Sequence, residues 1–592
     1  MNGFYGRTLR VDLSSKAFTI KPIDREVLTR YLGGKGLAAH LLTELNRPGV
    51  DALAPENAVI FATGPLGNSM IWGSCRFGVY TKSPQTGLFA ESYCGGKTPD
   101  AIDAAGFDAV VVQGRAAEPT VLVVDPDGAE FHEADDLWGM QTYAAEEAVR
   151  ERFSMPGYRM KGAVVIGPAA EKGVRFSVVE TDRWRSAGRT GVGTVMGAKK
   201  LKGILFAGDR KRPQADPDGA KAFAKNFLNM FKDHAAASAY KNLGTPMLVK
   251  ITNTAGAFPT RYWQQGTFEH WERISADALL RQCTVKPNAC SKCFMACGKL
   301  STVKEGRHAS LTIEGPEYET IYAFGGLCLI DRIEEIAYLN DICDREGMDT
   351  ITAGNLCALA IEAARRGKMN FKIDYGDVDA IAGLLRMIAR REGIGDILAE
   401  GIRHAAKVWA LEDIAVHVKG MEPAGYDPRP LKGMGLAYGT SDRGACHLRA
   451  TFYKLELSGI IPPDQIKGKA ELFLDIESRL TIFDMLVLCR FYRDFYLWDK
   501  LEEVIGLVTG LAASEKTLKE KALDVATLIR RFNIREGITP QDDRLPKFLH
   551  QPLQDTGKVI TESEMEALLK DYYRLHGWDD NGVPPSGQKH SD

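Results

Sequence analysis

Three cysteines stand close together near the middle of the chain, at a spacing that suits metal coordination. Cys290, Cys293 and Cys297 form a C-x2-C-x3-C pattern in KPNACSKCFMACGK. A [4Fe–4S] cluster often takes three thiolates from one local run and a fourth from a distant residue. Zinc is the main alternative, because C-x2-C is also half of a tetrahedral zinc site. No matching C-x2-C or H-x3-H pair follows, so the spacing favours an iron–sulfur cluster.

The fourth thiolate has to come from one of the remaining cysteines, and spacing does not choose among them. The candidates are Cys75, Cys94, Cys283, Cys328, Cys343, Cys357, Cys446 and Cys489. The chain has 11 cysteines, an odd number that cannot all pair. We therefore expect a reducing compartment with free thiols, several of them buried as small apolar groups.

Glycine-rich segments with nearby cations are the second feature that could do chemistry. They are LGGKGLA (32–38), CGGK (94–97), AGRTGVGTVMGAKKLKG (187–203) and RGACHLRA (443–450). Glycine lets a backbone approach an anion closely, and successive N–H groups can bind phosphate. Arg189, Lys199, Lys200 and Lys202 add cationic partners. The pattern predicts phosphate or pyrophosphate binding; turns at strand ends are the alternative, and no P-loop is present.

The elements that must position these residues change in character along the chain. Up to about residue 208, short β-branched runs predict strands at 58–62, 77–80, 109–113, 120–124, 162–166 and 175–179, after a hairpin at 9–20. Helical periodicity then dominates at 217–236, 333–345, 351–366, 378–391, 396–408, 470–496 and 517–534. We predict an α+β protein with a β-rich N-terminal cofactor-binding domain (1–208) and two mainly helical domains (209–415 and 416–592). The polar tail after Gly577 is expected to end disordered.

Composition excludes several classes of protein. The 592 residues are 45% hydrophobic and 26% charged, which is typical of a globular protein. Lys+Arg 75 against Asp+Glu 77 gives 75 − 77 = −2, so no global field favours nucleic acid. Neither a signal peptide nor an apolar run long enough for a membrane span is read. We expect a cytoplasmic protein.

Several ordered motifs together resemble the aldehyde:ferredoxin oxidoreductase family of tungsten (less often molybdenum) bis-pterin enzymes. They are YGRTLRVDLS, YLGGKGLA, SCRFGVYTKSPQTG, AGRTGVGTVMGAKKLKGI, CSKCFMAC, IEGPEYET, DREGMDT, SDRGACHLRA and GWDDNGVP. The resemblance covers nearly the whole chain. It implies a tungsten or molybdenum centre held by two pterins, a [4Fe–4S] cluster and a Mg²⁺ ion that bridges the pterin phosphates.

The resemblance also implies site residues. Cys489 would be the fourth cluster ligand, because it closes a D-x-x-G-L-C motif that begins at Asp484; Val487 stands where the family has glycine. A second such motif runs from Asp344 to Asp349. Arg76 and Arg189 would meet the pterin phosphates, and carbonyls near Tyr93 and Thr190 would meet Mg²⁺. The full cofactor-binding set is Arg76, Tyr93, Gly95, Gly96, Arg189, Thr190, Gly191, Asp344, Met348, Asp349, Arg449, Asp484 and Leu488.

Glu314 and His447 are carried over as the acid–base pair beside the metal. Glu314 would take a proton as an aldehyde is hydrated and oxidised, and His447 would hydrogen-bond the substrate oxygen. Glu317 and Glu319 are competing assignments for the glutamate. The metal needs no protein ligand in this family, and electrons leave through the cluster to ferredoxin or a dedicated electron-transfer subunit.

Two alternatives to an aldehyde-oxidising enzyme remain at this point. A tungsten-dependent benzoyl-coenzyme A reductase subunit would use the same cofactor for reduction. A non-enzymatic Fe–S or zinc protein explains the cysteines but neither the two aspartate motifs nor the arginine–glycine segments. Some family members bridge subunits with an iron held by E-x-x-H, but 332–348 contains no histidine, so that site is not carried over. Homo- or hetero-oligomer formation stays open.

Overall fold

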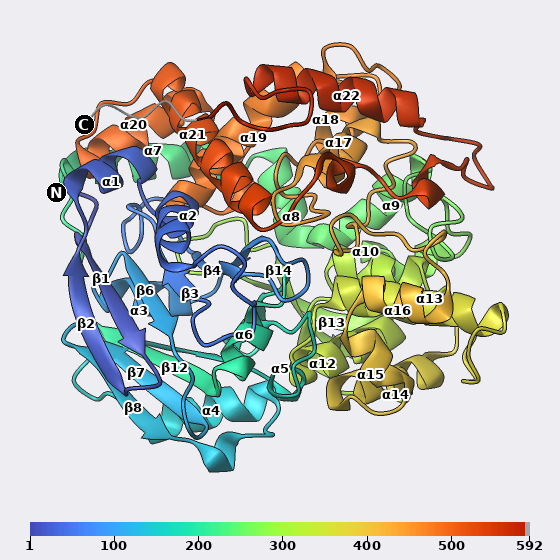
Figure 1. Ribbon diagram of the computed structural model, residues 1–592, viewed down its shortest axis with the longest axis horizontal. Coiled ribbons are helices and arrows are strands. Elements are labelled where there is room, and N and C mark those ends of the chain that lie inside the picture. The colour runs from blue at the N-terminus through green and yellow to red at the C-terminus, as the bar shows by residue number, and fades with distance from the viewer. Residues whose placement is uncertain (587–592) are drawn as a thin grey trace.

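The N-terminal part of the chain forms two six-stranded sheets, as the computed structural model of residues 1–586 describes (Figure 1). The first sheet has the order β2-β1-β6-β3-β4-β5. Its strands are β1 (Arg7–Asp12), β2 (Ala17–Pro22), β3 (Val59–Ala62), β4 (Phe77–Lys82), β5 (Phe89–Cys94) and β6 (Ala109–Gln113). The β1–β2 hairpin expected from the sequence is confirmed by its antiparallel register.

The second sheet has the order β11-β10-β9-β12-β7-β8. Its strands are β7 (Thr120–Asp125), β8 (Gly128–Glu133), β9 (Met160–Val165), β10 (Val179–Thr181), β11 (Arg185–Ala187) and β12 (Leu201–Gly208). Buried side chains from both sheets share one core, in which the ring of Phe61 lies 6.4 Å from Phe77 and 5.9 Å from Phe206. Burial of these alternating apolar faces drives the two sheets together.

Helices cover the two sheets and connect their strands. They are α1 (Arg25–Tyr31), α2 (Gly34–Leu45), α3 (Thr98–Ala104), α4 (Thr142–Arg152), α5 (Pro168–Glu171) and α6 (Val192–Ala198). Helix α2 packs on β4, and α3 packs on β9 and β12. A third sheet, β13 (Cys283–Asn288), β14 (Gly298–Val303) and β15 (Thr312–Glu314), carries the cysteine triplet in the loop between its first two strands.

The rest of the chain is mainly helical, so the predicted α+β class is confirmed. One group, from green to yellow in Figure 1, contains α7 (Pro217–Phe231), α8 (Ala235–Leu243), α9 (Leu248–Thr254), α10 (Ala276–Gln282), α11 (Tyr318–Thr320), α12 (Ile333–Glu346), α13 (Thr350–Arg365), α14 (Val378–Arg390), α15 (Ile394–Ala399) and α16 (Ile402–Trp409). The orange and red group contains α17 (Lys432–Thr440), α18 (Tyr453–Leu457), α19 (Lys469–Leu486), α20 (Trp498–Thr509), α21 (Glu515–Arg535) and α22 (Glu562–Leu575). The two boundaries between the three predicted domains stay a prediction.

Some predicted elements are wrong in extent. Residues 175–178 are not a strand, because the chain turns there and Ser177 makes only an isolated bridge to Met348. The helices predicted at 217–236, 396–408 and 470–496 each break. The second of them breaks at Gly401 (φ +87°), and the third ends at Val487 (φ +56°). A left-handed residue cannot continue a right-handed helix.

No helix within residues 1–586 combines the length and the apolar character that crossing a membrane requires. The expected disorder at the end of the tail concerns residues 587–592, which lie outside the described residues.

Candidate active site and cluster site

The cysteine triplet and Cys489 meet at one place, from two distant segments of the chain. The loop between β13 and β14 carries the triplet, and Cys489 follows the end of α19. Gly73 connects the two segments: its N–H donates to the Lys292 carbonyl (3.1 Å), and its carbonyl accepts from the Cys489 N–H (2.9 Å). The phenol oxygen of Tyr492 lies 3.5 Å from the Cys293 sulfur. Backbone hydrogen bonds through Gly73 therefore hold Cys489 beside the loop that carries the other three cysteines.

A fifth thiol, that of Cys75, lies in the same group. Hydrogen bonds with the Cys290 and Cys489 sulfurs, together with burial, raise the pKa of Cys75 well above its ordinary value. The same hydrogen bonds lower the pKa of Cys290 to about 6 and that of Cys489 well below its usual range. Cys75 therefore keeps its proton while its two neighbours are poised as thiolates, which are the form that binds metal.

A glycine pair holds the cysteine loop from the other side. A Cβ atom on Gly95 would lie 2.8 Å from the Cys290 sulfur. The Gly96 carbonyl accepts from the Ser291 N–H (3.0 Å), and Gly96 has φ +118°, a conformation that glycine adopts without strain. The predicted residues Gly95 and Gly96 thus contact the cysteine loop directly.

Among residues 1–586, no group of three or more His, Cys, Asp or Glu side chains is arranged to hold a single metal ion. The thiol ligands of a four-iron cluster belong to different iron atoms. They therefore stand farther apart than the ligands of one ion. The thiols of Cys293 and Cys297 each interact electrostatically with those of Cys290 and Cys489. The four predicted ligands therefore gather at one place, as such a cluster requires, with Cys75 beside them as an S–H donor.

A cavity of about 320 Å³ lies next to the cysteine site, and His447 lines it together with Glu317 and Glu319. The His447 Nε2 is 3.5 Å from the Glu319 Oε1. Burial raises the pKa of Glu319 to about 7, whereas burial and nearby arginines lower the pKa of His447 well below its ordinary value. The pair can therefore hold and release a proton near neutral pH with the imidazole uncharged.

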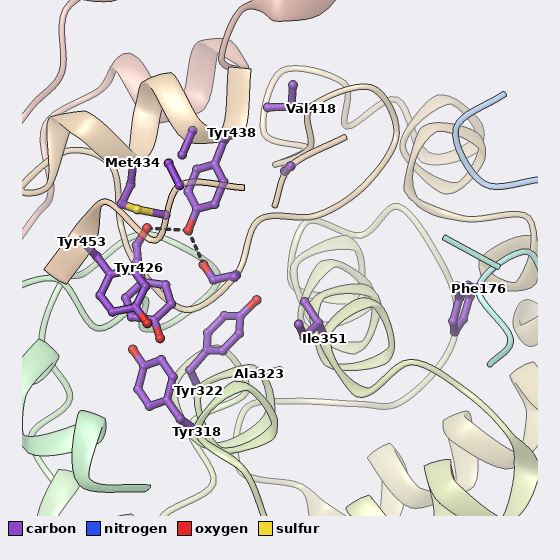
Figure 2. Packing of buried hydrophobic residues seen from close by; sticks show 14 of the residues in the cluster. Phe176, Tyr318, Tyr322, Ala323, Ile351, Val418, Tyr426, Met434, Tyr438 and Tyr453 are labelled. Atoms are coloured by element: carbon purple, nitrogen blue, oxygen red, sulfur yellow. Dashed lines mark hydrogen bonds between the residues drawn. The ribbon is translucent and has the colours of Figure 1, made fainter. Parts of the chain in front are cut away.

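Tyrosines form the opposite wall of this cavity. Figure 2 shows the rings of Tyr426 and Tyr453 face to face, with centroids 3.9 Å apart, and Tyr318 close by. The ring of Tyr426 lies 5.5 Å from that of His447. Tyr438, whose hydroxyl donates to the Ala424 or Tyr426 carbonyl (3.0 and 2.9 Å), fixes the backbone behind Tyr426. This part of the cavity wall is therefore aromatic.

The structure does not bring Glu314 into the cavity of His447. Glu314 ends β15, pairs with Arg185, and accepts a hydrogen bond from Asn288 (3.1 Å). It lines a different cavity, of about 560 Å³, with Tyr143 and Trp184. Burial raises the pKa of Glu314 to about 7 as well, so a perturbed pKa alone does not separate the candidates. Their positions do separate them, because Glu319 lines the cavity of His447 and Glu314 does not.

Arg76 lies between the cysteine site and the cavity. Its guanidinium donates a hydrogen bond to the Cys489 sulfur, and the same side chain lines the cavity of His447. The Arg76 Nε has no hydrogen-bond partner. One side chain therefore contacts both predicted redox sites.

Buried ion pairs hold the predicted pterin-binding residues together. Arg189 pairs with Asp349 (Nε to Oδ2 3.1 Å), whose carboxylate also caps the N-terminus of α13. Arg449 pairs with Asp484 (Nη1 to Oδ2 3.0 Å), and Arg490 binds the same carboxylate. Each pair belongs to one of the two aspartate motifs, at Asp344–Asp349 and Asp484–Cys489.

The described part of the chain leaves many buried polar atoms unpaired around these pairs. Those without a hydrogen-bond partner include Arg76 Nε, Glu319 Oε1, Glu422 Oε1, Arg443 Nε, His447 Nδ1, Arg449 Nε and Nη2, and Arg490 Nη1. A folded protein normally pairs such groups. A large ligand with several phosphate oxygens and ring nitrogens would pair them, so the residues fit a pterin cofactor.

The remaining predicted residues have other partners. Asp344 is buried and accepts from Asn340 Nδ2 (2.7 Å), and Met348 bridges to Ser177. The Tyr93 hydroxyl donates to Glu91 (2.6 Å), and the Thr190 carbonyl accepts from Ser83 (2.8 Å). Gly191 is left-handed at the start of α6, and Leu488 is buried after α19. Their roles toward a cofactor stay predictions.

The lysines suggested as phosphate partners point elsewhere. Lys199 donates to the Pro55 carbonyl (2.7 Å), Lys202 pairs with Glu171 (2.5 Å), and Lys200 donates to Ala117. Glycines in the same segment allow close packing, because a Cβ on Gly193 would clash with the Val178 carbonyl and one on Gly197 with the Ala170 carbonyl. Packing, rather than phosphate binding, therefore explains the lysines and glycines of this segment.

The sequence offered Glu317 and Glu319 together as competing assignments and Cys75 as one of eight candidates for the fourth thiolate, and it did not single out Arg490 or Arg493. The signal for Glu319 was its place in IEGPEYET, with three glutamates within six residues. Cys75 directly precedes Arg76, and both arginines follow Cys489 within four residues. The signal in the sequence was that each of these residues lies close to a predicted cluster ligand or cofactor-binding residue.

Comparison with known proteins identifies the family of the chain. The buried arginine–carboxylate pairs and the unpaired polar atoms around them are the features expected of a protein that binds a large cofactor. Two sequence models match: "Aldehyde ferredoxin oxidoreductase, N-terminal domain" over residues 8–208 and "Aldehyde ferredoxin oxidoreductase, domains 2 & 3" over residues 222–590. The chain belongs to the aldehyde ferredoxin oxidoreductase family.

Similar relatives include tungsten-containing aldehyde ferredoxin oxidoreductases from Pyrococcus furiosus (31% identical) and Thermococcus kodakarensis (32% identical). Each alignment covers 99% of this chain and 98% of the relative. The WOR-like subunit of an aliphatic sulfonate oxidoreductase from Pyrococcus furiosus is 28% identical, over 99% of this chain and 96% of that protein. The active site complex BamBC of benzoyl coenzyme A reductase shares the fold, with a TM-score of 0.85 and 24% identity over 98% of this chain and 96% of that chain.

Proposed function

We propose that this chain oxidises aldehydes to carboxylates with water and passes the electrons to ferredoxin or a separate electron-transfer subunit. The balanced reaction is RCHO + H₂O → RCOO⁻ + 3 H⁺ + 2 e⁻. The observation that carries the proposal is the Glu319–His447 pair, in a cavity that Arg76 connects to the cysteine site. Relatives whose names state this activity support it across the full chain.

The cofactors follow from the residues that fit them. Arg189, Asp349, Arg449 and Asp484 would hold a tungsten (or molybdenum) bis-pterin with its bridging Mg²⁺. The four predicted thiols of Cys290, Cys293, Cys297 and Cys489 would hold a [4Fe–4S] cluster. When bound, the metal centre supplies two-electron oxidation and the cluster supplies a one-electron exit.

Glu319 is the residue that moves a proton. Because burial raises its pKa to about 7, the carboxylate can accept a proton from water as that water adds to the aldehyde carbon. The neutral His447 Nε2 then accepts a hydrogen bond from the protonated carboxyl group, which leaves an Nδ1–H for the substrate oxygen. The His447 Nδ1 has no protein partner, so it is available for this contact.

Anaerobic purification followed by metal analysis and a viologen-reduction assay tests the proposal. We expect tungsten or molybdenum with about four irons per chain, and aldehyde-dependent reduction of the viologen. Zinc without tungsten, molybdenum or iron would overturn it. Benzoyl-coenzyme A belongs in the same assay with reduced viologen as the donor, since oxidation of the viologen by that thioester, and no aldehyde oxidation, would assign the reductase function instead.

A further inference from the structure

Lys299 is a buried cation at the end of the cysteine loop. It is the second residue of β14, two positions after Cys297, and it is 2% exposed. Its Nζ donates to four carbonyls, those of Tyr240 (2.9 Å), Ala296 (3.0 Å), Cys297 (3.0 Å) and Gly298 (3.2 Å). An ammonium group has three protons and no acceptor, so these contacts account for all of its protons.

The hydrogen bonds of Lys299 shape the backbone around the third cysteine of the triplet. Three of the four carbonyls are successive and converge on one atom, so the chain is turned where it leaves the loop. Ala296 is left-handed there (φ +43°), a conformation that costs energy for a residue with a Cβ atom. The bonds from Lys299 offset this cost and fix the backbone from which the Cys297 side chain extends.

Elements outside the cysteine loop hold Lys299 itself. Its backbone pairs with Pro287 in the β13–β14 ladder, and its carbonyl accepts from the Gly315 N–H (2.7 Å). Helix α8 ends against its side chain, because a Cβ on Gly244 would lie 3.1 Å from the Lys299 Cγ. Tyr240 belongs to the last turn of α8, where the helix dipole favours a cation. The ammonium group therefore has a fixed position to which the loop is attached.

The charged groups around Lys299 are a thiol, two carboxyl groups and one cation. Cys297, Glu317 and Glu314 attract the ammonium group, and Arg185 repels it. The two glutamates have other partners, since Glu314 pairs with Arg185 and Glu317 accepts from the Thr245 hydroxyl. Of the attracting groups, the Cys297 sulfur acts most strongly on Lys299. The positive charge is therefore coupled above all to a predicted cluster ligand.

We propose that Lys299 is a positioning residue of the [4Fe–4S] cluster. Its hydrogen bonds hold Cys297 in place for metal binding, and its charge raises the reduction potential of the cluster. This rests on the cluster of the proposed function and adds a residue that controls it. Reduction by one electron makes a cluster more negative by one charge. A buried cation beside a ligand sulfur stabilises the reduced form, because charges interact strongly where water is excluded.

Lys299→Met in the holoenzyme tests both parts of the proposal, since methionine has a similar length and no charge. The chelator concentration that removes half of the iron should fall about 10- to 100-fold, the range typical when a contact that supports a metal ligand is lost. The clusters that remain should have a lower reduction potential, measured by redox titration followed by electron paramagnetic resonance. Unchanged iron retention would overturn the positioning role, and an unchanged potential would overturn the role of the charge.

Lys304→Met is the matched control. The Lys304 Nζ also donates to carbonyls in the last turn of a helix, those of Leu280 (3.4 Å) and Arg281 (2.9 Å) in α10. Lys304 is exposed, however, and follows the far end of β14. Its replacement should leave both the iron retention and the potential at their wild-type values. A change in potential as large as that of Lys299→Met would contradict a specific role of Lys299.

Lys299→Arg decides the outcome if Lys299→Met keeps too little iron for a titration. Arginine retains the charge, so this variant should keep more iron than Lys299→Met and a potential near that of the wild type. Iron loss equal to that of Lys299→Met would contradict the proposal. A wild-type protein without iron would overturn the proposed cluster together with this role. An iron-loaded wild type that oxidises no aldehyde would overturn the proposed activity alone, because neither measurement needs a substrate.

Discussion

The Nε2 of His447 lies 3.5 Å from the Oε1 of Glu319, in a cavity walled by stacked tyrosines. Glu319 belongs to the short helix α11, whereas His447 lies in the loop between α17 and α18. Two segments more than a hundred residues apart thus bring an acid–base pair together. The Gly425 N–H donates to Glu319 (3.0 Å) and holds the carboxylate in place.

Replacement of Glu319 by glutamine should lower kcat for aldehyde oxidation by about 10² to 10⁴-fold, the range typical of a lost general base, while tungsten and iron are retained. In the proposed mechanism, the carboxylate form of Glu319 is the base. Because burial raises the Glu319 pKa to about 7, kcat/KM should rise with pH up to about 7 and level off above it. The variant should lose this rise.

Glu314→Gln is the matched control for this experiment. Glu314 has a similarly raised pKa but lies in the other cavity, bonded to Arg185 and Asn288. A large loss of activity in Glu314→Gln together with an active Glu319→Gln would return the catalytic role to Glu314.

Cys489→Ser should remove most of the iron, since the other three predicted ligands cannot complete a four-thiolate site. Cys75→Ala should keep its iron, because Cys75 retains its proton beside the Cys290 and Cys489 sulfurs. It should also lower the reduction potential of the cluster, since a hydrogen bond to a ligand sulfur stabilises the reduced form. Iron content and redox titration followed by electron paramagnetic resonance measure both effects. Full iron in Cys489→Ser with none in Cys75→Ala would exchange the two roles.

Gly95→Ala should lower the iron content, because the new Cβ would lie 2.8 Å from the Cys290 sulfur. Backbone on both sides of the cysteine loop limits how far that sulfur can move, since Ser291 is bonded to Gly96. Gly188→Ala is the control: its Cβ would meet only the Ser186 hydroxyl at 3.5 Å, an ordinary contact. Equal iron in the two variants would show that the loop adapts to the added methyl group.

At position 487, glycine should be more stabilising than alanine by about 1 kcal/mol, contrary to the usual order in helices. Val487 ends α19 with φ +56°, a conformation that costs energy for any residue with a Cβ. Val487→Gly is compared with Val487→Ala, because both variants lose most of the buried valine side chain. Apparent melting temperatures at one scan rate measure the difference in stability between them. At position 526, inside α21, alanine should be more stabilising than glycine, so Ala526→Gly should lower the melting temperature. If alanine were also the more stabilising residue at position 487, the backbone strain at Val487 would be disproved.

The sequence predicted the long helices well and the irregular segments poorly. Helices α12, α13, α14 and α21 match their predicted ranges within two residues at each end, because apolar periodicity over many turns is a strong local signal. The predicted helix 470–496 instead ends at Leu486, where Val487 turns left-handed. A β-branched residue gives no local signal for that conformation. Its place at the end of α19, with Gly34 packed against it, depends on the tertiary fold.

The residue types and their order in the chain were enough to place it in its family and to identify His447 and the cysteine triplet as candidates. Only the tertiary structure decided which of Glu314, Glu317 and Glu319 meets His447. The three glutamates span the end of β15 and the start of α11. The backbone changes direction between them, so Glu314 lines one cavity, whereas Glu317 and Glu319 line the cavity of His447. The fifth thiol at the cysteine site is likewise a property of packing, since it depends on which groups distant segments place beside a buried side chain.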